Sequence, residues 1–264
     1  MSEPTPTTPK PETETPQALD PALQERVEAF TSDCLNNHSP IACHQLAEFS
    51  SVVQSDFAQS FKLYHNSCYN EKSPHVKKGD QQGIVTGPSG SRFYPPSCFN
   101  LARQHLSGRG TVKSDLSAYK ALVRSCDEAG HVGACHHLGV MLLSGSETVG
   151  KDEARGLKCL ERSCEMGDVS SCHAVASVVL AGSETYPEVA RLYADEEKRR
   201  SRVITALDGG CKGGYAPSCF NLAAFYKSIG DKANFGVYKG ITEGLVRSGN
   251  GSGVGQKGGG MRVG

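Results

Sequence analysis

Cysteine is the residue type whose number and spacing most directly suggest chemistry in this chain. Eleven cysteines occur among 264 residues, and ten of them fall into five pairs of one design. The two members of a pair stand eight or nine positions apart in four cases and thirty apart in the fifth. The pairs are Cys34 with Cys43, Cys68 with Cys98, Cys126 with Cys135, Cys164 with Cys172, and Cys211 with Cys219, and Cys159 is left over. Such pairs can form disulfides, exchange disulfides or bind metals.

The spacing distinguishes among these three kinds of chemistry. Zinc sites commonly contain a C-x2-C pair, and the sequence has none, so no metal site is predicted. Regular pairing favours five disulfides, which need an oxidising compartment, whereas the alternative is a cytosolic protein with reduced cysteines. We expect Cys159 to be a free thiol. It is either a small apolar residue in a helix-packing surface or a group that reacts or bridges to a partner.

Histidines and methionines near the second cysteines offer a possible ligand set for haem. The C-x-x-C-H signature of covalent haem attachment is absent. The candidate side chains for a His/Met site are His44, His136, His137, His173, Met141 and Met166. No motif selects among them, and the simpler interpretation places the histidines on the surface or between repeats. We therefore predict no cofactor, with haem as the open alternative.

The cysteines lie within an internal repeat of two helices. An aliphatic residue stands three positions after the second cysteine of each pair and a small residue four positions after it, as on one face of a helix. The small residues, which let a neighbouring helix approach closely, are Ala47, Ala102, Gly139, Ala176 and Ala223. A second helix carries apolar residues seven and four positions before each first cysteine. The second cysteines Cys98, Cys135 and Cys172 follow one another at intervals of 37 residues, which is the length of a helix–turn–helix repeat.

Two insertions and two tails interrupt or flank these repeats. Residues 185–202 are charged and favour helix. Residues 76–96 separate Cys68 from Cys98, and because removing these 21 residues restores a spacing of nine, they are either a surface loop or an unspliced intron. Residues 1–20, rich in Pro, Thr and Glu, and the glycine-rich residues 248–264 are predicted to be disordered. Residues 21–247 then form the repeat domain.

Charge and hydropathy exclude several classes of function. Twenty-eight basic residues balance 28 acidic ones, so we expect no nucleic-acid partner. No apolar run approaches the roughly 20 residues of a membrane span. The first residues lack the hydrophobic core of a secretory signal and are not arginine-rich. Disulfides without a cleavable signal point to the mitochondrial intermembrane space, where oxidation itself traps small cysteine-rich proteins, with the oxidative import machinery as a partner.

The repeats resemble a known family. Helix pairs of about this length, with cysteines linking one repeat to the next, resemble Sel-like repeats, which are related to tetratricopeptide repeats. They look most like the cysteine-rich branch grouped as the hcp beta-lactamase family. The similarity rests on Pro96-Ser-Cys-Phe-Asn-Leu-Ala102, which recurs as Pro217-Ser-Cys-Phe-Asn-Leu-Ala223, and covers about residues 23–245. It implies an all-α, right-handed α-solenoid of about five helix–turn–helix repeats, with a disulfide stapling each repeat to the next.

The family name invites a search for a serine enzyme. Ser117-Ala-Tyr-Lys120 matches S-x-x-K, yet neither S-D-N nor K-T-G follows, and Tyr119 falls on the apolar row of a repeat helix. We therefore predict that the protein is not an enzyme.

The resemblance also implies a function. A short chain with five such cysteine pairs and no presequence is similar to non-enzymatic assembly factors for mitochondrial respiratory-chain complexes, chiefly cytochrome c oxidase. Its partners would be protein clients of that assembly, bound along the solenoid. One alternative is a thiol–disulfide oxidoreductase or haem-binding chaperone in copper or haem delivery. The other is a cytosolic or secreted scaffold with no respiratory role.

Overall fold

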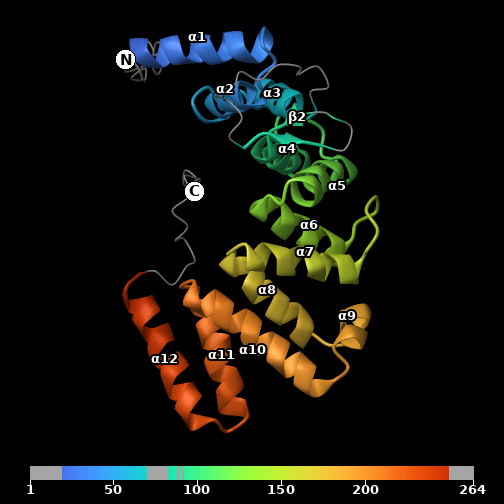
Figure 1. Cartoon of the computed structure of the whole chain (residues 1–264), viewed down its shortest axis with the longest axis vertical. Helices are drawn as coiled ribbons and strands as arrows, with labels where there is room; N and C mark the ends of the chain where they lie inside the picture. Colours follow the sequence, from blue (N-terminus) through green and yellow to red (C-terminus); the bar gives the residue numbers. More distant parts are fainter. Residues whose placement is uncertain (1–19, 70–82, 88–89, 91, 250–264) are drawn as a thin grey trace, which may run out of the picture.

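The computed structural model describes residues 20–69, 83–87, 90 and 92–249. Over these ranges the chain is built from helices that follow one another along a curved path, from α1 at one end to α12 at the other (Figure 1). The helices are α1 (Pro21–Leu35), α2 (Pro40–Val52), α3 (Phe57–Tyr69), α4 (Pro95–Ser107), α5 (Asp115–Val123), α6 (Val132–Ser144), α7 (Glu153–Glu165), α8 (Val169–Leu180), α9 (Pro187–Leu192), α10 (Glu196–Lys212), α11 (Ala216–Ser228) and α12 (Lys232–Arg247). The predicted all-α solenoid is confirmed.

Five helix pairs form the repeats. They are α2/α3, α4/α5, α6/α7, α8/α10 and α11/α12, which we number one to five, and α1 precedes them as a half repeat. The two helices of each pair pack on each other, and the second helix of a pair packs on the first helix of the next pair. In the second repeat, a short π-helix, η1 (Arg124–Glu128), continues α5. Among the described residues, no helix is both long and apolar enough to cross a membrane.

The predicted apolar face is the core of the solenoid. The aliphatic residues three positions after the second cysteines are at most 9% exposed; they are Leu46, Leu101, Leu138, Val175 and Leu222. The small residues one position further on are also buried. One core cluster runs through repeats one to three and a second through repeats three to five. Each interior is therefore shared between neighbouring repeats, as a solenoid requires.

Local sequence signals place the helix ends. At seven helix starts, a backbone N–H of the first turn donates to the side-chain oxygen of the capping residue; these residues are Asp20, Ser39, Ser114, Asp152, Asp168, Asp195 and Asp231. At the end of α4, Gly108 has a φ of 71°, a left-handed conformation that a glycine adopts without strain. The turns between helices are therefore set by capping residues and glycines that can be recognised in the sequence.

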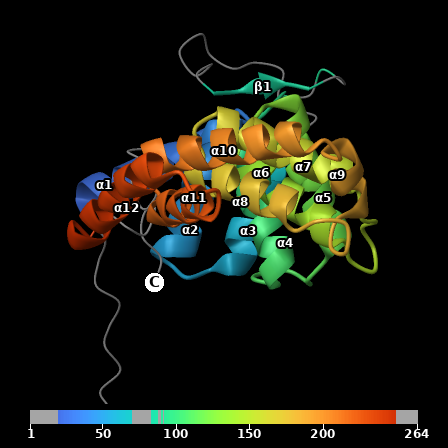
Figure 2. The same cartoon turned by 90° about the horizontal axis from the view of Figure 1, so that it is seen from below.

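The described part of the 76–96 insertion forms a small β-hairpin. Strand β1 (Val85–Thr86) pairs antiparallel with β2 (Arg92–Phe93), beside the helix stack (Figure 2). The ring of Phe93 is fully buried, and the Arg124 guanidinium lies 4.2 Å from its centre. This end of the insertion is therefore packed onto the second repeat, unlike a simple surface loop. Helix α4 begins at Pro95, inside the range we assigned to the insertion.

Parts of the predicted tails and insertions can be compared with the structure. Residues 185–202 contain α9 and the first turns of α10, in agreement with their helical composition. Helix α1 begins at Pro21 and α12 ends at Arg247. The tail residues 1–19 and 250–264, where we predicted disorder, and residues 76–82, 88–89 and 91 of the insertion, predicted to be a surface loop or an unspliced intron, lie outside the described residues.

Candidate functional site

The cysteine pairs lie where one repeat meets the next. The structure joins all five predicted pairs as disulfides, with Cα–Cα distances between 4.6 and 4.9 Å. The bonds join Cys34 to Cys43, Cys68 to Cys98, Cys126 to Cys135, Cys164 to Cys172, and Cys211 to Cys219. Each predicted partner is therefore the partner found in the structure.

The position of each bond is the same in every repeat. The first cysteine of a pair lies at the end of α1, α3, α7 or α10 or within η1, and the second lies near the start of the following α2, α4, α6, α8 or α11. At the two outermost junctions, the second cysteines Cys43 in α2 and Cys219 in α11 are at most 1% exposed. Nine of the ten paired side chains are buried, and Cys164 is partly exposed. Each bond therefore ties the start of a repeat to the helix before it.

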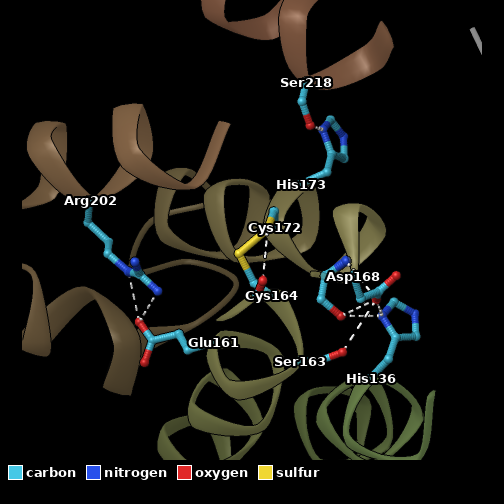
Figure 3. The surroundings of a disulfide bond; sticks show 10 residues. His136, Glu161, Ser163, Cys164, Asp168, Cys172, His173, Arg202 and Ser218 are labelled. Atoms are coloured by element: carbon cyan, nitrogen blue, oxygen red, sulfur yellow. Dashed lines mark hydrogen bonds and ion pairs between the residues drawn. A yellow bond between two sulfur atoms is a disulfide. The ribbon is translucent and has the colours of Figure 1, made fainter. Parts of the chain in front are cut away.

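A second set of links between repeats consists of histidine–serine contacts. The residue after the second cysteine is a histidine in repeats one, three and four. Its Nδ1 contacts the hydroxyl of a serine in the next repeat, at 2.8 Å for His44–Ser97, 2.7 Å for His136–Ser171 and 3.3 Å for His173–Ser218. The last two contacts flank the Cys164–Cys172 disulfide (Figure 3). We call these three contacts the histidine ladder.

A third set of contacts links the last turn of a repeat to the first residue of the same repeat. The serine before the first cysteine of a junction donates a hydrogen bond to the carbonyl of the first residue of its own repeat. The three bonds are Ser67 to Pro40 (2.6 Å), Ser125 to Pro95 (2.8 Å) and Ser163 to Val132 (3.1 Å). In each of repeats one to three, the serine hydroxyl therefore ties the last turn of the repeat to its first residue.

The group around His136 has the residue types of a hydrolase but not the geometry. Ser171 donates its only hydroxyl hydrogen to Asp168 at 2.6 Å, so Ser171 accepts from His136 Nδ1. Asp168 lies 3.2 Å from that same nitrogen (Figure 3). In a serine nucleophile relay, the serine and the acid contact different ring nitrogens. This cluster therefore positions groups at the junction and leaves the serine without a base.

Burial and hydrogen bonds determine the charge states of His44 and of Asp168 beside the ladder. Burial lowers the pKa of His44 to about 4, although the Glu48 carboxylate acts in the opposite direction. Burial tends to raise the pKa of Asp168, but hydrogen bonds from His136 and Ser171 lower it to about 2. At neutral pH, His44 of the ladder is therefore neutral, and Asp168, which contacts the ladder and caps α8, is ionised.

A pocket of about 330 Å³ lies beside the ladder and brings together some of the candidate haem ligands. Its lining includes Leu106, Asp115, His136, His137, Val140 and Met141. His137 donates from Nδ1 to the Gly133 carbonyl at 2.9 Å, which leaves Nε2 as its acceptor. A histidine held in this way has the arrangement of a metal ligand. The other candidates lie elsewhere: His44 and His173 contact serines of the ladder, and Met166 is 37% exposed.

The S-x-x-K residues occupy the start of α5. The Ser117 hydroxyl accepts a hydrogen bond from Ser114, the capping residue of that helix, at 2.9 Å. Lys120 lies on the exposed side of the same helix. Ser117 therefore contacts the cap of α5, and Lys120 is solvated.

Comparison with known proteins identifies the repeat. The model of the Sel1 repeat matches residues 40–70, 95–121 and 132–168, which are repeats one, two and three of the structure. These three repeats are Sel1 repeats. Repeats four and five continue the same junction chemistry beyond the matched range, with a disulfide and a ladder contact.

Two curated relatives share part of this Sel1 array. The chain is 24% identical to cytochrome c oxidase assembly factor 7 of Danio rerio over 200 residues, which cover 75% of this chain and 58% of that protein. It is 23% identical to the protein of the same name from Xenopus tropicalis over 110 residues, covering 40% of this chain and 38% of the relative. The chain thus spans little more than half the length of the first relative.

Solved structures share the Sel1 fold. A protective antigen of uropathogenic Escherichia coli strains with an SLR fold has a TM-score of 0.64 at 18% identity, covering 84% of this chain and 41% of that one. A Sel1 repeat protein from Oxalobacter formigenes has a TM-score of 0.60 at 15% identity, covering 86% and 81%. At these identities the likeness concerns the fold alone.

Sequence reasoning missed most polar contacts of the Sel1 junctions. The histidines were visible, but their serine partners were not recognised, although a serine precedes the second cysteine in three copies: Ser97, Ser171 and Ser218. The burial of the predicted free thiol agrees with one of the two alternatives, a small residue in a helix-packing surface. Cys159 is 6% exposed in α7 and is the one cysteine of the described chain outside a disulfide.

Proposed function

We propose that this protein is a non-enzymatic assembly factor for mitochondrial respiratory-chain complexes, chiefly cytochrome c oxidase. The observation that carries the proposal is the alignment of three quarters of the chain with cytochrome c oxidase assembly factor 7 of Danio rerio. The protein binds its clients along the solenoid and works in the mitochondrial intermembrane space. It is retained there by the oxidative import machinery that forms its disulfides.

The junctions support an oxidising location. Nine of the ten paired cysteines are buried, and the disulfides close loops of eight or nine positions at four junctions and of 30 positions at the fifth. A loop of nine residues contributes about 2.6 kcal/mol in the chain-entropy description. Because a repeat array depends on its neighbour interfaces, oxidation stabilises every interface in turn. Such a protein folds and persists where thiols are oxidised.

The side-chain chemistry supports a binding role. The serine and the acid at His136 share one ring nitrogen, and the S-x-x-K serine, Ser117, lies in the first turn of α5 and contacts the capping Ser114. Repeat solenoids commonly bind protein segments along their extended surfaces. Residues 21–247 act as the client-binding domain of the proposal, flanked by the tails 1–20 and 248–264.

Removal of the gene tests the assembly role. In cells that lack the protein, the amount of assembled cytochrome c oxidase on native gels should fall, and re-expression of the full chain should restore it. ATP synthase serves as the control complex and should stay at its normal level. Normal oxidase in the deleted cells would contradict the proposal. Fractionation with protease protection should place the tagged protein in the intermembrane space.

A second function is thiol–disulfide exchange or haem binding in copper or haem delivery, and the pocket that holds His136, His137 and Met141 favours the haem-binding form of it. Haem titration should then give a Soret shift that His137→Ala removes and His38→Ala retains, since His38 lies in the turn before α2. For exchange with clients, at least one of the five disulfides should be reduced at cellular glutathione potentials. Five resistant bonds and no Soret shift would exclude this function.

A further inference from the structure

Two sulfur atoms and a carboxylate oxygen lie close together at the junction between the second and third repeats. The Sγ atoms of Cys159 and Cys126 and a carboxylate oxygen of Asp127 all lie within 4.8 Å of one another. Cys126 is itself bonded to Cys135. The free thiol therefore lies next to a disulfide, in a site where both partners of that disulfide are at most 1% exposed.

The two elements are held together on either side of this thiol. Arg155, Cys159 and Arg162 follow one another along one face of α7, at spacings of four and three residues. Arg155 bonds Asp127 at 2.7 Å, and Arg162 donates to the Cys126 carbonyl at 3.0 Å. Both contacts reach η1, a π-helical turn of a kind that often marks functional positions. Cys159 lies between the two anchors and faces the Cys126 sulfur.

We propose that Cys159 is a second disulfide partner of Cys126, so that this junction carries an exchangeable bond. The Cys159 thiolate attacks Cys126 Sγ, the Cys126–Cys159 bond forms, and the Cys126–Cys135 bond breaks. Cys135 leaves as a thiolate and takes up one proton, which replaces the proton lost by Cys159. No oxidant or reductant is consumed. The second and third repeats stay linked through either sulfur.

The surroundings make this exchange slow at neutral pH. Burial, followed by the charge of Asp127, raises the pKa of Cys159 to about 11, while Arg155 and Arg162 act in the opposite direction. Asp152, at the start of α7, adds to the rise. Since the thiolate is the attacking species, the rate of exchange increases with pH up to that value. The Cys126–Cys135 pairing is thus kinetically protected.

Removal of Cys135 from the full chain tests the proposal. The Cys135→Ser variant is incubated with oxidised glutathione, which takes up the two electrons of the new bond and becomes two reduced molecules. Free thiols are then alkylated and the digest is analysed by mass spectrometry. We expect a peptide linked through Cys126 and Cys159, with no alkylated cysteine. Both residues alkylated, or a glutathione adduct on Cys126, would overturn the proposal.

The matched control is Cys172→Ser, which frees Cys164 on the same helix as Cys159. Five residues along a helix place Cys164 well around from Cys159, so Cys164 should be alkylated or carry glutathione. If Cys135→Ser fails to fold, the wild-type chain gives the answer. After incubation near pH 10, alkylation should shift from Cys159 to Cys135 in part of the molecules. Label confined to Cys159 would contradict the exchange.

Discussion

Gly139 in α6 and Gly156 in α7 lie against each other where the two helices of the third repeat cross. A Cβ atom on Gly139 would stand 2.9 Å from the Gly156 carbonyl oxygen and 2.8 Å from Leu160 Cγ. A Cβ on Gly156 would stand 3.0 Å from the Gly139 oxygen. Side chains do not tolerate such distances without a shift of backbone. This crossing therefore depends on two glycines, 17 positions apart in the sequence.

Gly139→Ala should destabilise the protein by about 1–3 kcal/mol, as overpacked cores do. The control is Gly240→Ala in α12, where an added Cβ meets nothing within 4 Å. Alanine favours helix over glycine, so the control should gain about 0.5–1 kcal/mol. Urea unfolding followed by circular dichroism measures both changes. Equal effects of the two substitutions would show that the close crossing carries no cost.

Ser97→Ala should destabilise the junction of the first and second repeats by about 1–3 kcal/mol, because it leaves the buried His44 Nδ1 without its partner. Ser67, which also contacts the Ser97 hydroxyl, keeps its bond to Pro40. Ser218→Ala should cost less, since the His173 contact is longer and partly exposed. Thermal unfolding of both variants tests this order. The exposed Ser177 in α8 supplies a control, and its alanine variant should match the wild type.

The cysteine pairs, the helix rows and the solenoid could be predicted because their signals are local or periodic. A cysteine pair lies within nine residues in most copies, and apolar side chains recur with the helix period. The ladder could not be predicted in this way because its partners are far apart. His44 and Ser97 are separated by 53 positions and meet only when two repeats stack. A recurring serine before the second cysteine was the available signal.

The hairpin in the insertion could not be predicted from the sequence for another reason. Its described strands are two residues long, too short for a period of two to be visible. Phe93 is buried because it packs beside Arg124 of the second repeat, a neighbour 31 positions away. Likewise, the proximity of Cys159 to Cys126 arises from the packing of α7 on η1. Spacing alone gives no hint of either contact.

Protonation of His44 should destabilise the protein as the pH falls from 6.5 to about 4. Its folded pKa of about 4 lies below the ordinary value of 6.5, so the unfolded chain binds the proton first. Stability is unaffected by this group above pH 6.5 and falls as the pH drops from 6.5 through 4, by about 3 kcal/mol in total. Urea midpoints at pH 7, 5.5 and 4 measure this loss.

The His44→Asn variant supplies the comparison for that titration. The asparagine amide can still contact Ser97 but does not titrate, so the stability of the variant should fall less between pH 6.5 and 4. Asp168 acts in a lower window. Its pKa is about 2 in the folded protein and 3.8 ordinarily, so its contribution is lost only as the pH falls from 3.8 through 2. Identical slopes for variant and wild type above pH 4 would refute the role of His44.

Removal of the Cys68–Cys98 disulfide should destabilise the protein more than removal of Cys164–Cys172. The first bond spans 30 positions and the second spans eight. The chain-entropy description gives about 3.6 kcal/mol for the longer loop and about 2.5 kcal/mol for the shorter one. Double alanine variants at each pair, compared by urea unfolding with the wild type, measure the two losses. A larger loss at the shorter loop would mean that contacts within the junctions outweigh the length of chain that each bond closes.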